Sequence, residues 1–232
     1  MTSSAIDAYK RQAAEHAVTF VESGMVVGLG HGSTAAFAVE RIGALLREGA
    51  LSDILAVPCS LEVASEAEGL GIPQTTLDEH PVVDLTIDGA DEVDPNLDLI
   101  KGGGGALLRE KIVACASRRE VIVVDESKLS ERLGLQFALP VEVIPFARTT
   151  EARFLESLGA KVILRGGRNP FLTDAGNLIL DCRWPAIEDA CELAARLDRR
   201  PGIVGHGLFL ELATDLVVAG PNGIRHSVRP KD

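Results

Sequence analysis

Short apolar runs and amphipathic stretches alternate along the first half of the chain. Residues 5–22 carry apolar side chains at spacings of three and four, which predicts an amphipathic helix. Four short runs are mainly apolar, as buried strands are: 25–29, 54–57, 82–87 and 121–124. Three helices are predicted between them: one from a Ser33 or Thr34 cap to about residue 47, one over 61–70 and one over 106–117. This alternation indicates a parallel sheet with helices on both faces.

The pattern changes after Lys128. Strands are predicted at 141–144, 161–164, 178–180 and 202–204, with helices at 150–158 and 187–197. This order is typical of a small α+β domain of split βαβ type. The apolar run 216–219 is expected to return to the first sheet. We therefore predict an α/β protein, with a catalytic Rossmann-like parallel-sheet domain of residues 1–132 and 207–232 and a second, smaller α+β domain of residues 133–206.

Composition and charge narrow the classes of function. The 232-residue chain has a formal net charge of -11, which argues against a general nucleic-acid surface but leaves room for a local anion pocket. Its four cysteines show no metal or redox spacing and are typical of a reducing compartment. The N-terminal stretch has no apolar signal core, and no apolar run approaches the roughly 20 residues of a membrane span. We expect a cytoplasmic protein with neither nucleic-acid nor membrane partners.

Three polar or glycine-rich segments follow predicted strands, at 28–34, 88–91 and 125–128. If the strands are parallel, all three lie at the sheet edge where ligands bind. The first segment, GLGHGST, can bind phosphate through backbone N–H groups and the start of the next helix. It is not the dinucleotide fingerprint, because Ser33 stands where the third glycine belongs. A tight strand-to-helix turn explains the segment equally well. His31 is the one histidine that stands inside this loop.

The segment 84–111 holds the densest candidate chemistry. Asp88 and Asp91 flank two small residues, Lys101 begins a run of four glycines, and Glu110 follows in the next predicted helix. A lysine beside glycine backbone N–H groups can stabilise an oxyanion that develops during a reaction. A carboxylate within reach of the substrate can remove a carbon-bound proton. Three alternatives remain: a turn cap for the aspartates, a divalent-metal site, and an exposed helix acid for Glu110. Farther along, Arg165 with its neighbours Arg168 and Asn169 is read as a solvated turn rather than an anion site.

The sequence resembles ribose-5-phosphate isomerases of the A type. Six segments carry the resemblance in the family's order: GLGHGSTA at 28–35, DLTIDGADEVD at 84–94, KGGGGALLREKI at 101–112, DESKL at 125–129, LPVEVIPFA at 139–147 and TDAGNLILD at 173–181. The resemblance extends from about residue 6 to residue 229, and the second and third segments together are highly specific for the family.

The resemblance implies an aldose–ketose isomerase that interconverts D-ribose 5-phosphate and D-ribulose 5-phosphate through an enediolate, in the non-oxidative pentose phosphate pathway. It implies no metal and no organic cofactor, and a homodimer or higher oligomer. Glu110 would be the catalytic base, while Asp88, Asp91 and Lys101 would bind the sugar, assist ring opening and hold the enediolate oxygens. The remaining substrate-binding residues that it implies are His31, Gly32, Ser33, Thr34, Gly89, Ala90, Gly102, Gly103, Gly104, Lys128 and Lys10.

Two positions depart from the family pattern. His31 stands where the family usually has Thr, which leaves the backbone contacts of the loop unchanged. Cys59 replaces Thr in a usual Pro-Thr-Ser, with little expected consequence. Two other classes of function stay open: a sugar-phosphate sensor, which would carry a DNA-binding segment, and a transferase with a glutamate nucleophile. An isomerase assay with and without a chelator separates these classes.

Overall fold

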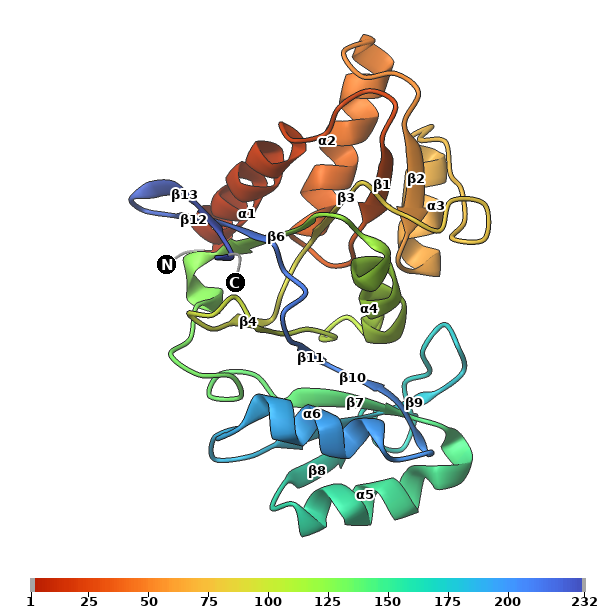
Figure 1. Cartoon of the computed structure of the whole chain (residues 1–232), viewed down its shortest axis with the longest axis vertical. Helices are drawn as coiled ribbons and strands as arrows, with labels where there is room; N and C mark the ends of the chain where they lie inside the picture. The colour runs from red at the N-terminus through yellow and green to blue at the C-terminus, as the bar shows by residue number, and fades with distance from the viewer. Residues whose placement is uncertain (1–2, 231–232) are drawn as a thin grey trace. The chain divides into compact units, whose positions relative to one another are not determined.

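The chain divides into two compact units in the computed structural model, which describes residues 3–230. The first unit contains residues 3–90, 109–128 and 211–230, and the second contains residues 91–108 and 129–210. In Figure 1 the first unit holds both the red N-terminal helix and the blue C-terminal hairpin. Residues 91–108 lie in the second unit, whereas the sequence-based ranges include them in 1–132; those domain ranges stay a prediction.

The first unit is built on a six-stranded sheet with the order β13-β12-β6-β3-β1-β2. Its strands are β1 (Val26–Leu29), β2 (Leu55–Pro58), β3 (Leu85–Asp88), β6 (Glu120–Asp125), β12 (Asp215–Gly220) and β13 (Gly223–Val228). All neighbouring pairs are parallel except the β12–β13 hairpin. The predicted return of 216–219 to the first sheet is confirmed, since β12 pairs in parallel with β6.

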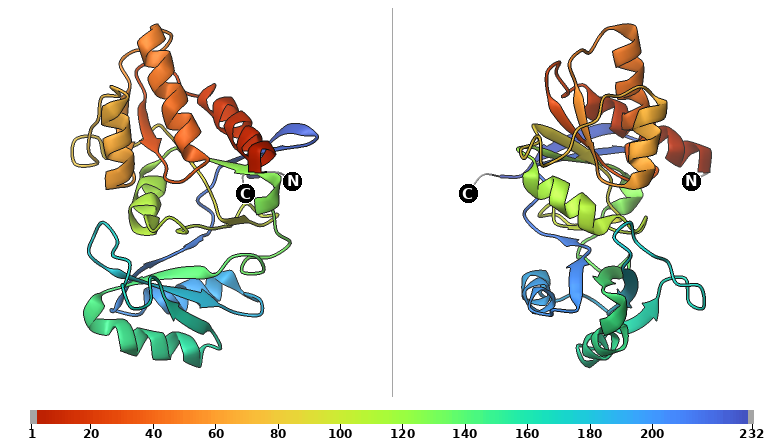
Figure 2. Two further views of the ribbon diagram at one scale, coloured as in Figure 1. Left: turned by 180° about the vertical axis from the view of Figure 1, so that it is seen from behind. Right: turned by 90° about the vertical axis from the view of Figure 1, so that its right-hand side faces the viewer.

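Helices cover both faces of this sheet. They are α1 (Ser3–Val18), α2 (Ala35–Glu48), α3 (Leu61–Gly69) and α4 (Leu107–Ala116), followed by the short 3-10 helix η1 (Glu126–Lys128). Apolar residues of α1, α2 and α3 pack with Val27 and Leu29 in one cluster, whereas Val113 of α4 packs with Val57 and Val83 in another. Alternate strand residues therefore point to opposite helical layers, and Figure 2 shows α4 apart from the other three helices.

Two helix ends differ from the prediction for a local reason. The first helix stops at Val18 instead of running to residue 22, because Thr19 donates its hydroxyl to the His16 carbonyl at 2.6 Å and the next turn tightens. The helix predicted over 187–197 begins at Ala190, where the Asp189 side chain accepts from the Glu192 N–H and caps it.

The second unit contains a four-stranded antiparallel sheet with the order β10-β7-β9-β8. In chain order its elements are β7 (Leu139–Val143), the 3-10 helix η2 (Pro145–Ala147), α5 (Arg148–Ser157), β8 (Lys161–Leu164), β9 (Leu178–Arg183), α6 (Ala190–Asp198) and β10 (Ile203–His206). This order and pairing are those of a split βαβ fold, as predicted. Leu155, Leu197 and strand residues such as Val141 form its buried core.

The same unit holds a small sheet that the sequence analysis missed. Its strands, in the order β11-β5-β4, are β4 (Glu92–Val93), β5 (Leu99–Ile100) and β11 (Leu208–Phe209), and both pairings are antiparallel. A two-residue strand is too short to show a period-2 pattern, so no hydrophobic pattern marks it.

A buried carboxylate joins the last two strands of the first unit. Asp215, 3% exposed at the start of β12, accepts two hydrogen bonds from Arg119 at 2.9 and 2.7 Å. Thr214 donates to it at 2.8 Å, and the Nε2 atom of His226 on β13 lies 2.6 Å away. Burial raises the pKa of Asp215, but these hydrogen bonds and the Arg119 charge outweigh it and lower that pKa to about 2.

None of the helices in the described residues is both long enough and apolar enough to cross a membrane. All four cysteines lie in the described part of the chain, and none of them is in a disulfide.

Candidate active site

The carboxyl ends of β1, β2 and β3 place three loops side by side. These strands are adjacent and parallel in the order β3-β1-β2, so the residues that follow them share one edge of the sheet. The loop 30–34 follows β1, Cys59 follows β2, and Asp88 ends β3. The predicted convergence of the first two polar segments is therefore present in the first unit. Lys128, half-buried in η1 after β6, lies at the end of the next strand along the same edge.

Asp88 is fixed against the backbone of the β1 loop. Its side chain is 1% exposed, and its Oδ1 atom accepts the N–H of Gly89 at 2.7 Å and the N–H of His31 at 3.1 Å. The chain passes so close to Asp88 at Gly30 that a methyl group there would lie 2.3 Å from Oδ1. Glycine at position 30 therefore allows the loop and the carboxylate to meet.

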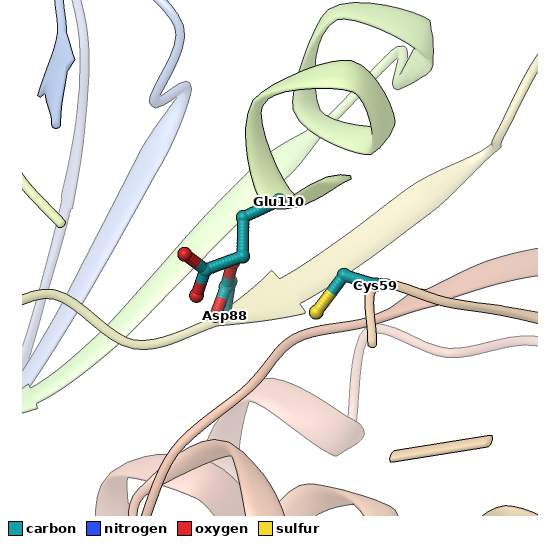
Figure 3. Close-up of side chains that lie close together, drawn as sticks. All are labelled: Cys59, Asp88 and Glu110. Atoms are coloured by element: carbon teal, nitrogen blue, oxygen red, sulfur yellow. The ribbon is translucent and has the colours of Figure 1, made fainter. Parts of the chain in front are cut away.

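Glu110 lies in the first turn of α4 and is 4% exposed. Its carboxylate, the Asp88 carboxylate and the Cys59 thiol each place one atom within 4.8 Å of the other two. Figure 3 shows the three side chains pointing into the same small space from three different elements. The structure thus brings two of the predicted catalytic residues together, and the alternative that Glu110 is an exposed helix acid is wrong.

This group is also a possible ligand set for a divalent cation. A thiolate and two carboxylates are ligands that Zn²⁺ accepts, and three protein ligands leave a position open. Within residues 3–230, Cys59, Asp88 and Glu110 form a group of three buried donor atoms close enough to hold an ion. The sequence-based expectation that the protein uses no metal stays a prediction. The sequence-based expectation gives Cys59 little consequence, although its place after a parallel strand points to the edge where ligands bind.

The β1 loop contains polar contacts that suit an anion. Lys10 on α1 donates its Nζ to the Ser33 hydroxyl at 3.0 Å, so the predicted lysine is brought to the predicted loop. Thr34 is the N-cap residue of α2, although its side chain makes no capping hydrogen bond. The His31 ring nitrogen Nε2 lies 3.1 Å from the exposed Glu62 carboxylate. The loop therefore offers an ammonium, hydroxyls and the start of a helix at one place.

The second unit contains the other two predicted catalytic residues. Asp91 precedes β4; its N–H bonds to the Ile100 carbonyl at 2.9 Å and its carboxylate accepts the Gly103 N–H at 2.7 Å. Lys101 follows β5, is 2% exposed, and has its Nζ 5.4 Å from the centre of the Phe209 ring. Gly103 and Gly104 are exposed. The small sheet and the residues that flank it therefore bring the aspartate, the lysine and the glycine run together within the second unit.

Glu92 anchors that small sheet, and sequence analysis did not give it a role of its own. It is 0% exposed, and its two carboxylate oxygens accept four backbone N–H groups, those of residues 134–137, at 3.0 to 3.1 Å. A buried carboxylate surrounded by backbone donors is a strong charge-assisted contact. Because Glu92 is the residue after Asp91, this contact also fixes the position of the Asp91 backbone.

The fold and the site define an α/β protein with two buried carboxylates and a thiol close together at the carboxyl edge of its parallel sheet. The model of the family described as ribose 5-phosphate isomerase A (phosphoriboisomerase A) matches residues 55–223. The chain is 57% identical over 228 residues to a ribose-5-phosphate isomerase A of Chloroflexus aurantiacus, covering 97% of this chain and 95% of that relative. The corresponding protein of Desulfatibacillum aliphaticivorans is 56% identical over 221 residues, with 94% and 96% covered. This chain therefore belongs to the ribose-5-phosphate isomerase A family.

Solved structures give the same assignment. The ribose 5-phosphate isomerase of Plasmodium falciparum superposes with a TM-score of 0.94 at 38% identity, covering 97% of this chain and all of that one. The ribose 5-phosphate isomerase A of Methanocaldococcus jannaschii gives 0.91 at 40% identity, with 96% and 99% covered. A D-ribose-5-phosphate isomerase solved in complex with phospho-erythronic acid gives 0.94 at 38% identity, with 97% and 99% covered.

Proposed function

We propose that this protein interconverts D-ribose 5-phosphate and D-ribulose 5-phosphate, the aldose–ketose isomerisation of the non-oxidative pentose phosphate pathway. Membership of the isomerase family supports this reaction directly. One observation in the site carries the proposal. The buried carboxylates of Glu110 and Asp88 lie close together at the edge of the sheet, beside a loop suited to binding phosphate.

The reaction moves a proton between two neighbouring carbon atoms. A carbon-bound proton beside a carbonyl is weakly acidic, so the protein must stabilise the enediolate more than it stabilises the sugar. We assign removal of the proton from C2 of the aldose, or from C1 of the ketose, and its return to the other of these two carbons, to the Glu110 carboxylate. A single positioned base of this kind contributes roughly 10²- to 10⁴-fold to the rate.

The remaining roles follow the chemistry of the side chains. We assign sugar binding and ring opening to Asp88 and Asp91, and stabilisation of the enediolate oxygens to Lys101 with the glycine run 102–104, in which the Gly103 N–H already binds the Asp91 carboxylate. Backbone donors aimed at a developing oxyanion contribute about 10²- to 10³-fold. The loop of residues 31–34, with Gly89 and Ala90 beside it and with Lys10 and Lys128, is assigned to the substrate's phosphate end and hydroxyls.

The decisive experiment is an isomerase assay on Glu110→Gln. We expect turnover to fall at least about 10²-fold with KM nearly unchanged, because the amide fills the same space but accepts no proton. Glu22→Gln, the same exchange at an exposed position of the first unit, is the matched control and should keep full activity. Equal turnover in the two variants would remove Glu110 from the reaction, and a wild-type protein inactive on ribose 5-phosphate would overturn the function itself.

Two further measurements test the intermediate and the ligand. Reaction in deuterated water should place solvent deuterium on the product carbon, because a base that shuttles a proton exchanges part of it with solvent. Phospho-erythronic acid should compete with substrate, since its carboxylate can occupy the place of the enediolate charge. The wild-type rate should be the same with a chelator present, as the expectation of a cofactor-free reaction requires.

We further propose that the protein is a cytoplasmic homodimer. The support is the sequence resemblance together with exposed apolar side chains in the second unit, of which Phe146 is 98% exposed. Light scattering on the eluted protein should give twice the chain mass of 24.6 kDa. A monomer mass at micromolar concentration would contradict the dimer.

A further inference from the structure

Arg165, the residue after β8, forms a clamp on the glycine run of the second unit: it binds both a carboxylate and two carbonyls of the run. Its Nε and Nη2 atoms bind the two carboxylate oxygens of Asp181 on β9 at 3.0 and 2.5 Å. Its Nη1 atom donates to the carbonyls of Gly102 at 2.8 Å and Gly103 at 3.1 Å. The arginine side chain is 17% exposed, so this is a partly buried contact and not the solvated turn that the sequence predicted.

The clamp determines which way the backbone donors of the run point. The described chain has no cis peptide bond, so each C=O is antiparallel to the N–H of the same peptide unit. The Gly102 carbonyl faces Arg165, and the N–H of Gly103 accordingly faces the other way and reaches the Asp91 carboxylate at 2.7 Å. By the same geometry, the Gly103 carbonyl on Arg165 turns the N–H of exposed Gly104 away from the arginine.

The turn that carries Arg165 also fixes the end of the run. Phe171 packs so closely on Gly105 that a methyl group at that glycine would lie 2.4 Å from the ring. The Arg165 guanidinium lies 6.0 Å from the centre of the same ring, and the Phe171 N–H bonds to the Arg165 carbonyl at 3.0 Å. The run is therefore held at both ends by one turn, whereas Arg168 in that turn is exposed.

We propose that Arg165, held by Asp181, is a positioning residue for the isomerisation: it fixes the glycine run so that the Gly104 N–H is presented to the substrate's oxygens. This inference rests on the proposed function of the run as part of the oxyanion site. Arg165 itself touches no reacting atom, because its guanidinium donates its hydrogen bonds to Asp181 and to the two glycine carbonyls. Without it the two peptide units can rotate, and a donor that must be pre-oriented becomes free to turn.

The test compares Arg165→Ala with Arg168→Ala, which removes the same charge from the same turn. We expect kcat of the Arg165 variant to fall on the order of 10²-fold, as when one oxyanion donor is lost. KM should change by less than about threefold, because the loss falls on the transition state. Arg168→Ala should keep the wild-type kcat. Low-millimolar guanidinium, well below denaturing concentrations, should restore part of the lost rate to Arg165→Ala alone.

A purely structural role gives a different result. It would lower the melting temperature and the active fraction, leave kcat per folded molecule unchanged and show no guanidinium rescue. Hydrogen exchange over residues 101–106 supplies a readout that needs no activity: it should accelerate in Arg165→Ala relative to Arg168→Ala. If the wild type is inactive on ribose 5-phosphate, the proposed function fails while this exchange difference still decides the clamp. Equal kcat values or equal exchange rates in the two variants would overturn the inference.

Discussion

Replacing Glu92 with glutamine should destabilise the second unit far more than an isosteric exchange usually does. The carboxylate accepts four backbone N–H groups from residues 134–137, two on each oxygen, and is 0% exposed. Glutamine keeps one acceptor oxygen and places an NH₂ group against the other two N–H donors. Two hydrogen bonds are lost, and two backbone N–H donors are left facing the NH₂ group.

The size of the effect follows from those two bonds. Hydrogen bonds to a charged group contribute about 1.5–3 kcal/mol each, so the unfolding free energy should fall by about 3–6 kcal/mol. That is a large fraction of the roughly 5–15 kcal/mol that stabilises a folded domain. Equilibrium urea unfolding measures it, with Glu156→Gln on the exposed face of α5 as the matched control, expected within about 0.5 kcal/mol of wild type. A loss below about 1 kcal/mol for the Glu92 variant would refute the reasoning.

Three further expectations concern the first unit. Gly30→Ala should abolish turnover and lower the melting temperature by several degrees, because its methyl group would lie 2.3 Å from the Asp88 carboxylate; normal turnover would contradict the close approach. The pKa of Asp215 falls from an ordinary 3.8 to about 2 on folding, so its contribution to stability is complete above about pH 4 and is lost as the pH falls toward 2. Asp215→Asn should flatten that part of the stability–pH curve, and an unchanged curve would mean that another group titrates there. Cd²⁺ should bind with a thiolate absorption band and inhibit the wild type, while Cys59→Thr should weaken both effects at least tenfold; equal inhibition of the two proteins would place the metal elsewhere.

Much of the architecture could be read from the sequence because it depends on long, strong patterns. Buried parallel strands have an apolar run between their ends, and β6 and β12 stand out for that reason. Helix ends were less certain, since they depend on single side chains: Thr19 ends α1 and Asp189 begins α6. The two-residue strands around Lys101 have no pattern at all, and only their pairing in space defines them.

The candidate site likewise contains residues that the sequence could suggest and residues that it could not. Asp88 and Glu110 could be chosen as candidates because carboxylates, a lysine and a run of four glycines fall within one short segment. The meeting of Cys59 with them could not, because two loops and a helix must fold before the thiol has neighbours. Arg165 looked like a surface turn because its partners, Asp181 and the glycine carbonyls, are 16 and more than 60 positions away in the sequence. Spacing along the chain carries no trace of such contacts.

The pairing of β6 with β12 has a consequence for how the protein is made. The chain finishes β6 at Asp125 and does not begin β12 until Asp215, and between them it builds most of the second unit. At a synthesis rate of about 5–20 residues per second, this leaves a strand buried at all six positions without one of its two partners for roughly 5–18 s. An open apolar strand edge recruits other chains, so slowing the ribosome over residues 126–214 should increase aggregation, and chaperone demand should peak in that interval.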